Sequence, residues 1–249
     1  MRNHFLRSVQ SSRLVTSGLK LHLDPDDSNS YSGSGTTYTN LASGVGNGTI
    51  NGPSYTAASS GDPGYFNFHG NSTWGNVDAS INFSAYDFGT AITVFVFIRP
   101  EEKSTNFKIG SIFSNAGSGG YRDGVNFYIN SWNSSNRKLS LEFGNGSSGA
   151  ALQSADNIIT YNQWSSATFI YDKSANIART YHNTTEVAES TSATIDANLN
   201  QAFAIGNFEP AFTIAMDYKG RMGIYLIYNK ALSAAEVTQN YNHFKNRYI

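Results

Sequence analysis

Hydrophobic and polar residues alternate in many short segments of this chain, with the period of two that a half-buried β-strand requires. In the first of these segments, Leu19, Leu21 and Leu23 are separated by Lys20 and His22. The segment 91–100, AITVFVFIRP, is instead apolar at both parities, which predicts a central strand that is covered on both faces. Further strands are expected within YFNFHG, KIGSIFS, VNFYIN, KLSLEF, SSATFIYD, IARTYHN, TTEVAES, QAFAIGN and GRMGIYLIYN.

Turn-forming residues separate these segments at short intervals. Asparagine–glycine pairs and similar sequences supply the positive φ angles that tight turns need. The turn signals are Asn47-Gly48, Asn51-Gly52, Asp62-Pro63-Gly64, Asn145-Gly146 and the cluster Gly117, Gly119 and Gly120. Many short strands at this spacing, without helices between them, predict one all-β domain built as an antiparallel sandwich.

One short helix is expected at the end of the chain, in LSAAEVTQNYNHFKNRY. Ser233 is a favourable N-cap, and Glu236 three residues later completes a capping box. Leu232 and Val237 are placed to form a hydrophobic staple across the first turn. One face of the helix should pack against the sandwich, because apolar residues recur at helical spacing at Val237, Tyr241, Phe244 and Tyr248.

Composition supports a sheet protein with a weakly charged surface. Charged residues make up 14% of the chain, against about 25% in an average globular protein, and aromatic residues also make up 14%. The polar surface must then be mostly Ser, Thr, Asn and Gly, which favour turns. A net charge of −1 gives no basic field for nucleic acid, so no nucleic-acid partner is expected. The absence of cysteine excludes disulfides and thiolate chemistry.

The segment 1–17 contains Arg2, Arg7 and Arg13 and has no apolar core. It does not fit a signal peptide, and no run in the chain is long enough to span a membrane, so no membrane partner is expected. We predict an N-terminal arm over residues 1–17 and one domain over residues 18–249. Two interpretations of the arm stay open: a solvated leader, or a basic segment that docks onto a neighbouring subunit of an assembly.

Three stretches resemble the laminin-G-like, concanavalin A-like jelly rolls. GLKLHLDPDDSNSYSGSGTTYTNLASGVGNGTINGPSY is similar to their opening region, with Tyr38 where a tryptophan is common. YNQWSSATFIYD is similar to a central strand of these domains, with Trp164 and Asp172 in place. GRMGIYLIYNKALSAAEVTQNYN is similar to their closing strand and helix, at Gly220, Ile227, Tyr228, Leu232, Ser233, Glu236, Val237 and Tyr241, with Met222 in place of the first isoleucine.

The resemblance covers the chain from about Gly18 to Tyr248 and implies a concanavalin A-like jelly-roll β-sandwich with a short C-terminal α-helix. One departure is YHNTTEVAES, which lacks the usual Asn-Gly hairpin turn. Similar domains are found in virion proteins of tailed phages and in bacterial surface proteins. The likeness therefore implies a virion protein, assembled in the host cytoplasm into an oligomeric particle with other virion subunits as partners.

Paired carboxylates matter because jelly rolls of this kind include glycoside hydrolases. Retaining enzymes need two carboxyl groups about 5 Å apart on one face. The Glu-x-Asp-x-(x)-Glu strand of the glucanase relatives is absent. Glu186 and Glu189 are three residues apart, which in a regular strand sends their side chains to opposite faces. Glu101 and Glu102 are expected to be solvated in a polar loop after Pro100. We therefore predict that the protein is not an enzyme.

A calcium site is one interpretation of LDPDDSNS, where Asp24, Asp26 and Asp27 place three hard oxygen ligands in one loop. An EF-hand does not fit, because Asn29 and Gly35 occupy its required glycine and glutamate positions. The resemblance keeps calcium as a candidate, since laminin-G-like domains often hold one ion at a sandwich edge. The alternative is that the aspartates cap a turn around Pro25.

Glycan contacts would come from aromatic side chains on loops rich in amides and hydroxyls. Trp74 in GNSTWGN and Trp132 in NSWNSSN fit this description, and Tyr121, Arg122 and Asp123 form a further polar-aromatic group. The alternative is that these aromatics cover sheet edges. Trp164 is expected to lie in the core.

The resemblance implies a structural or decoration protein of a phage particle, and together with the residue patterns it favours a non-catalytic lectin-like sandwich that presents a glycan-binding face. The alternative is a cellular carbohydrate-binding or adhesion module, and the third possibility is a glycoside hydrolase.

Overall fold

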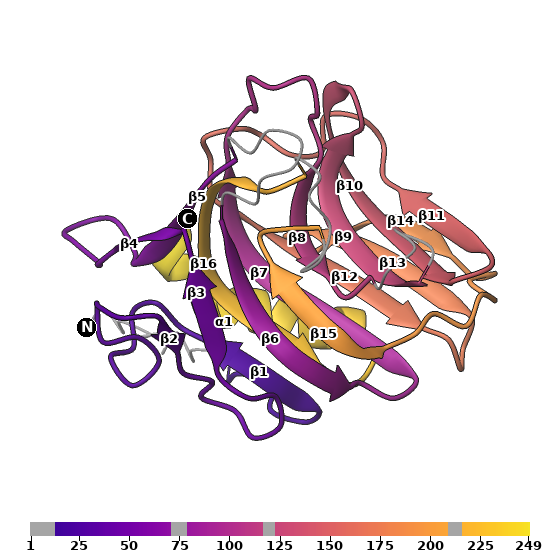
Figure 1. Ribbon diagram of the computed structural model, residues 1–249, viewed down its shortest axis with the longest axis horizontal. Helices are drawn as coiled ribbons and strands as arrows, with labels where there is room; N and C mark the ends of the chain where they lie inside the picture. Colours follow the sequence, from indigo (N-terminus) through magenta and orange to yellow (C-terminus); the bar gives the residue numbers. More distant parts are fainter. Residues whose placement is uncertain (1–12, 71–78, 117–122, 209–215) are drawn as a thin grey trace, which may run out of the picture.

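Two antiparallel sheets pack face to face, and one helix covers part of the outer face of the first sheet (Figure 1). The computed structural model describes residues 13–70, 79–116, 123–208 and 216–249. In spatial order, sheet A contains β14 (Thr185–Ser190), β13 (Ile177–His182), β12 (Ser165–Asp172), β7 (Ala91–Pro100), β16 (Lys219–Tyr228), β5 (Tyr65–His69) and β4 (Ser54–Thr56), and β1 (Leu19–Leu23) also pairs with β16. Sheet B contains β11 (Gly149–Gln153), β10 (Ser134–Asn145), β9 (Asp123–Ser131), β8 (Gly110–Ser114), β15 (Asn200–Ile205), β6 (Ser80–Asp87), β3 (Gly48–Asn51) and β2 (Thr37–Tyr38). The predicted antiparallel sandwich is confirmed.

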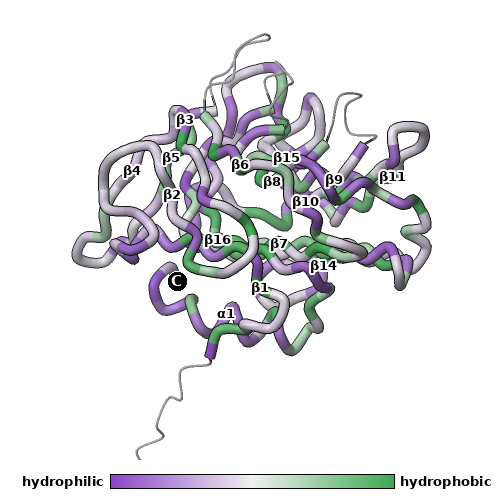
Figure 2. The backbone as a smooth tube through the Cα atoms, turned by 60° about the horizontal axis from the view of Figure 1, so that its bottom comes forward, coloured by the Kyte–Doolittle hydropathy of each residue, from purple (hydrophilic) through white to green (hydrophobic). Residues whose placement is uncertain are grey.

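The main core lies between the sheets, where alternate side chains of each strand face the opposite layer. On β9, Phe127 and Ile129 are buried in this core, whereas Tyr128 between them belongs to a cluster on the outer face. The ring of Phe127 stacks on Phe169 of β12 with centroids 4.9 Å apart, which joins the two sheets directly. In Figure 2 the hydrophobic segments gather in the strands and the hydrophilic ones in the loops. Strand parity therefore decides which residues supply cohesion and which are left for surface chemistry.

β7 and β16 lie at the centre of sheet A and are buried on both faces. Along β7, Val94 and Val96 join the core between the sheets, whereas Phe95 and Phe97 join a second apolar cluster on the outer face. The prediction that residues 91–100 form a central strand covered on both sides is confirmed. Sheet B provides one cover and the C-terminal helix provides the other.

α1 (Ala234–Tyr248) begins with the predicted capping box. The Ser233 hydroxyl accepts a hydrogen bond from the Glu236 N–H, and the Glu236 carboxylate accepts one from the Ser233 N–H at 2.9 Å. Its buried positions are Val237, Asn240, Phe244 and Tyr248, so the predicted apolar face is largely confirmed, with Asn240 as an unpredicted polar member. No helix in the described part of the chain has the length and apolar character needed to cross a bilayer.

The last turn of α1 packs on a β-bulge in β16. The register between β16 and β7 shifts between Met222 and Tyr225. At this point the Ile224 N–H donates a hydrogen bond to the Tyr248 hydroxyl at 2.8 Å. A Cβ on Gly223 would lie 2.4 Å from the Tyr248 ring. Glycine is therefore required here because the ring packs directly on the backbone of the strand.

The segment before β1 also packs against α1, through a buried polar group. The Val15 N–H donates to Asn240 Oδ1 at 3.0 Å, and the Val15 carbonyl accepts a hydrogen bond from the Tyr228 hydroxyl at 3.0 Å. Asn240 Nδ2 in turn donates to the Tyr228 hydroxyl oxygen at 2.9 Å. This arrangement accounts for a buried asparagine on the packing face of the helix, since buried polar groups need partners.

The described part of the predicted arm, residues 13–17, thus contacts the domain. Gln239 Nε2 on α1 donates to the Arg13 carbonyl at 2.7 Å, and the Arg13 side chain is exposed. Arg2 and Arg7 lie outside the described residues. The division into an arm over 1–17 and a domain over 18–249 stays a prediction.

The strands that the sequence pattern did not predict are β2, β3, β4, β6 and β11. Several are very short, and β11, GAALQ, is largely exposed at the edge of sheet B, so it carries no alternating pattern. The turn in YHNTTEV uses Asn183 at φ 55° in place of the usual glycine. Trp164 was expected in the core, but it lies one residue before β12, partly buried in the outer cluster, with its ring 4.9 Å from that of Tyr248.

Replacing Gly223 by alanine should destabilise the protein by about 1–3 kcal/mol, because the added methyl group must displace the buried Tyr248 ring. Gly46→Ala is the matched control, since a Cβ at Gly46 meets nothing within 4 Å. Urea unfolding of the two variants measures the difference. Equal midpoints for Gly223→Ala and Gly46→Ala would contradict the close packing of Tyr248 on β16.

Candidate functional site

Trp132 lies in the tight turn between β9 and β10, and its side chain is 41% exposed. Asn130, at φ 70°, bends the chain just before it and donates a hydrogen bond from Nδ2 to the Lys108 carbonyl at 2.8 Å. The Lys108 N–H donates to the Trp132 carbonyl at 2.8 Å. The ring of Phe107 meets the indole edge-on, with centroids 5.0 Å apart. The neighbouring loop thus holds an exposed indole in a defined position.

A pocket of about 210 Å³ opens beside Trp132 on the outer side of sheet B. Its polar lining residues are Tyr128, Ser131, Glu142 and Gln153, and its apolar lining residues are Ile109, Trp132, Phe208 and Met216. The lining comes from β9, β10 and β11 and from the segments that flank β8 and β15. A concave site with aromatic walls and a few polar groups is the usual form of a small-ligand site.

Tyr128 and Glu142 form the central polar contact of this pocket. The Tyr128 hydroxyl donates a hydrogen bond to Glu142 Oε1 at 2.7 Å. Burial raises the pKa of Glu142 above its usual value, and the hydrogen bond from Tyr128 opposes that rise. Burial, together with the Glu142 carboxylate, also raises the pKa of Tyr128, which keeps its hydroxyl protonated as a donor. A carboxylate has about four acceptor positions, so Glu142 has capacity for further donors from a ligand.

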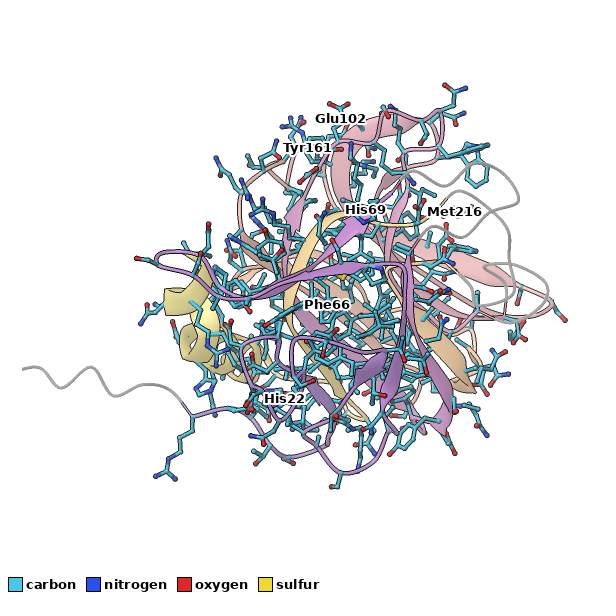
Figure 3. The ribbon with its side chains drawn as sticks, turned by 60° about the vertical axis from the view of Figure 1, so that its left-hand side comes forward. His22, Phe66, His69, Glu102, Tyr161 and Met216 are labelled. Carbon is cyan, nitrogen blue, oxygen red and sulfur yellow. The ribbon has the colours of Figure 1, made fainter. Side chains whose placement is uncertain are left out.

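Buried polar contacts fix the walls of the pocket. Lys103 and Asp217 form an ion pair at 3.1 Å with almost no exposure, and Lys103 Nζ also donates to the Ile109 carbonyl at 3.1 Å. A buried pair with these additional hydrogen bonds is satisfied, whereas either charge alone would be costly. The Ser111 N–H donates to the carbonyl of Met216, which is labelled in Figure 3, at 2.9 Å. These contacts attach the segments that carry Ile109 and Met216 to the sheet.

Two of the predicted glycan-contact residues, Trp132 and Asp123, lie in the described part of the chain, and one of them is at this pocket. Trp132 forms part of its lining. Asp123 begins β9, whereas Trp132 follows the end of that strand, so the whole extended length of the strand, about 26 Å, lies between them. Trp74, Tyr121 and Arg122 lie outside the described residues. Asp123 is therefore not part of the same site.

Tyr128, Glu142 and Gln153 were not predicted as site residues. Alternation in VNFYIN and KLSLEF does place Tyr128 and Glu142 on outward positions. Their pairing depends on the β9–β10 register, which shifts between Ser134 and Leu139. Gln153 belongs to β11, an edge strand that the pattern did not predict. The sequence therefore indicates that Tyr128 and Glu142 face outward, but it does not indicate that they contact each other.

The three aspartates of the candidate calcium site are engaged by protein groups. Asp24 accepts two contacts from Arg247 Nη1, at 2.9 and 2.8 Å, and Asp26 Oδ1 accepts a hydrogen bond from the Gly64 N–H. Asp27 Oδ1 accepts hydrogen bonds from Asn29. Among the residues that the structure describes, no group of three acidic or histidine side chains could hold a metal ion. The cluster fastens the first loop to the end of α1, which favours the structural interpretation over calcium.

The expectation that Glu186 and Glu189 point to opposite faces is wrong. The β13–β14 register shifts between Thr180 and Tyr181, a bulge that adds one residue to β14. Both glutamates consequently reach Arg179, at 3.6 Å for Glu186 and 2.6 Å for Glu189. The alternation rule fails at a bulge. The two carboxylates share one arginine on the surface instead of forming a pocket.

Comparison with known proteins identifies the fold. Residues 69–238 match the concanavalin A-like lectin/glucanases superfamily. No curated protein sequence matches the chain. Among solved structures, the chain is similar to the binding domain of botulinum neurotoxin DC in complex with SialylT, with 14% identity, a TM-score of 0.65, and coverage of 91% of this chain and 52% of that chain. It therefore spans about half the length of those toxin chains.

A second similar structure is matched over nearly its whole length. Domain 4 of AbnA, a GH43 extracellular arabinanase from Geobacillus stearothermophilus, was solved in complex with arabinotriose. It shares 17% identity with this chain at a TM-score of 0.62, over 91% of this chain and 99% of that one. At this level of identity the likeness establishes the jelly-roll fold.

The raised pKa of Glu142 predicts a pH effect on stability. In the pH range between the ordinary pKa of a glutamate, 4.5, and the higher pKa of Glu142 in the folded protein, the native state binds more protons than the unfolded state. The unfolding free energy should therefore decrease as pH rises through this range. Glu142→Gln removes that decrease, so its stability relative to the parent protein should increase with pH.

Denaturant unfolding between pH 4 and pH 8 checks this expectation. Tyr128→Phe is the informative companion, because loss of the hydrogen bond that stabilises the carboxylate should extend the decrease to higher pH. If the difference in unfolding free energy between Glu142→Gln and the parent protein does not change with pH, then burial does not raise the pKa of Glu142.

Proposed function

The chain belongs to the concanavalin A-like lectin/glucanases superfamily, and we propose that it is a non-catalytic, lectin-like protein that binds a glycan in the pocket beside Trp132. The exposed indole at this pocket is the observation that carries the proposal. A solvent-facing tryptophan costs hydrophobic stabilisation that burial would supply. In the described residues it is the one large aromatic side chain left this exposed.

The chemistry of the pocket suits a sugar. A sugar ring presents an apolar C–H face that packs on an aromatic ring, and Trp132 offers such a platform. Its hydroxyl groups require both donors and acceptors, which Glu142, Gln153 and Ser131 provide. The similarity to a domain solved with arabinotriose supports the choice of a glycan over other small ligands.

The proposal of a binding function, and not a catalytic one, rests on the number of carboxylates. Glycoside hydrolysis requires two, about 5–5.5 Å apart for retention and about 6.5–9.5 Å apart for inversion. Glu142 is the one carboxylate among the described residues that line the pocket. Glu186 and Glu189, a closely spaced pair on the surface, are both bound to Arg179.

Trp132→Ala should weaken glycan binding at least about tenfold, which corresponds to about 1.4 kcal/mol. A glycan array identifies the ligand, and calorimetric titration of that glycan and of arabinotriose measures the loss. Trp132→Phe is the matched control, because it retains an aromatic face and should retain most of the affinity. The turn is exposed, so both variants should keep the thermal stability of the parent protein.

Two results would overturn the proposal. One is an array without any bound glycan, and the other is full binding by Trp132→Ala. Release of reducing sugar by the parent protein, lost in Glu142→Gln, would instead replace the binding role by a catalytic one.

The resemblance to virion domains supports a more specific role, as a decoration or structural protein of a phage particle that presents the pocket outward. In this proposal the basic arm contacts neighbouring subunits. Its described end is held on the domain by backbone hydrogen bonds of Arg13 with α1 and of Val15 with α1 and β16. A cellular adhesion module would use the same pocket without the assembly role.

Deletion of residues 2–12 should leave the domain folded, because it spares the contacts of Val15 with α1 and β16, and should abolish incorporation into particles. Sedimentation of assembled particles with the bound protein measures incorporation. A full-length Arg2→Gln, Arg7→Gln variant separates the charge of the arm from its length. Undiminished incorporation of the truncated protein would remove the assembly role of the arm and leave the glycan site untouched.

A further inference from the structure

α1 covers only part of the outer face of sheet A, and an arginine pair lies where this cover ends. Tyr248 of α1 stacks on Phe97 of β7 with centroids 4.5 Å apart, and Arg99 is the next residue of β7 on the same face. Arg221 of β16 lies directly opposite Arg99 and, on its other side, opposite Asn67 of β5. Such cross-strand neighbours have their Cβ atoms about 5 Å apart, and like charges in this position destabilise a sheet.

The next row of the same face adds positive charge. Lys219 of β16 pairs with His69 of β5, which is labelled in Figure 3. Lys219 Nζ donates to the Glu102 carbonyl at 3.0 Å and makes no ion pair in the described residues. The ends of β5, β16 and β7 thus bring Arg99, Arg221 and Lys219 together. We call Asn67, Arg99 and Arg221, with Lys219 beside them, the arginine row.

Neither arginine of this row is neutralised within the described residues. The Arg221 guanidinium lies over the ring of Tyr65, 4.5 Å from its centroid, and makes no ion pair there. Arg99 uses Nε for a hydrogen bond to the Asn162 carbonyl at 2.9 Å and leaves its Nη groups available. Because a guanidinium has five N–H donors, most of the donors of this pair can reach a ligand.

Two other arginines in the described residues are paired with carboxylates. Arg179, also on sheet A, binds both Glu186 and Glu189. Arg247 binds Asp24 and Asp26. Arg99 and Arg221 differ from these two because they face each other across neighbouring strands and make no ion pair in the described residues.

A pocket of about 230 Å³ adjoins the arginine row. It is lined by Gln163, Trp164, Ser165, His182, Asn183 and Tyr241, among others. Ser165 pairs with Ile98 in the β12–β7 register, which brings the preceding residue, Trp164, beside Arg99. The Trp164 ring also lies 6.2 Å from that of Tyr65, on which Arg221 rests. Trp164 therefore links the pocket, which it lines, to the arginine row beside it.

One polar group beside the arginine row lacks a protein partner in the described residues. The buried Nε1 of Trp164, which lines this pocket, makes no hydrogen bond there. A buried, unsatisfied donor costs about 1–3 kcal/mol, so it calls for an explanation, such as a partner supplied by a ligand. This donor is an observation independent of the charges of the arginine row.

From this combination we infer a second binding site, for an acidic sugar that carries a carboxylate or a sulfate. Adjacent guanidinium groups recognise such anions through bidentate hydrogen bonds. Trp164 and Tyr241 offer aromatic faces for the ring, and Gln163 and Asn183 offer amides for its hydroxyls. This site lies on sheet A, on the opposite layer from the pocket beside Trp132, and does not depend on that pocket.

Titration with matched sugars tests the inference. 3′-Sialyllactose and lactose differ by one carboxylate-bearing residue. A heparin-derived tetrasaccharide serves as the sulfated sugar. The parent protein should bind at least one of the acidic sugars about tenfold or more tightly than lactose, with an affinity that falls as salt increases. The double variant Arg99→Gln, Arg221→Gln should lose this preference, and the double lysine variant should recover it only in part, because lysine lacks the bidentate fork.

Arg179→Gln is the matched control, since it removes an arginine of the same sheet that is already ion-paired, and it should bind the acidic sugars like the parent protein. Trp132→Ala should also leave acidic-sugar binding unchanged, which separates this site from the pocket on sheet B. Removal of two facing positive charges should leave thermal stability equal or higher.

Three results would overturn the inference. They are no binding of either acidic sugar, equal binding by the parent protein and the double glutamine variant, and loss of binding in Trp132→Ala alone. Binding of a poly-glutamate peptide as tight as that of the acidic sugars would show a site for an acidic protein segment instead.

Discussion

Two-sided burial of the central strands of sheet A is the constraint on which the rest of this structure depends. β7 and β16 have apolar side chains on both faces, and each large one contributes about 1.5–3 kcal/mol only when it is removed from water. Sheet B covers one face. The other face requires α1, which follows β16 directly in the chain and returns across it. The contacts that hold α1 in place follow from this need: the Tyr248 ring on Gly223, the Asn240–Tyr228–Val15 hydrogen bonds, and the ion pair between Arg247 and Asp24.

Cohesion and recognition are consequently divided between the inner and outer sides of the sheets. Inward residues such as Phe127 and Phe169 join the layers, and the residues between them face outward and are free of that role. On sheet B, this outward side carries Tyr128 and Glu142 beside the exposed Trp132. On sheet A, α1 ends before the strands do, and the uncovered ends carry Arg99 and Arg221. Both candidate surfaces lie where an outward face lacks apolar cover.

Few residues of this chain are charged, so the positions of the charged residues are informative. Only 14% of the residues are charged, and several of them form specific pairs: Lys103 with Asp217, Arg179 with two glutamates, and Arg247 with two aspartates. The Lys103–Asp217 pair is nearly excluded from solvent and positions a wall of the Trp132 pocket. Arg99 and Arg221 instead face each other across neighbouring strands without an ion pair in the described residues, and departures from local consistency tend to mark functional sites.

The sequence by itself determined the class of fold, most strands and the terminal helix, because alternation, turn residues and a capping box act over a few neighbouring residues. It placed Trp132 in an exposed polar turn and Glu142 on an outward position. Tertiary structure alone decided which side chains contact one another. The β9–β10 register brought Tyr128 to Glu142, a bulge turned Glu186 and Glu189 to the same arginine, and the return of α1 gave Asp24 a guanidinium partner. The physical reason is that strand parity is local, whereas register, bulges and packing partners depend on segments far apart in the chain.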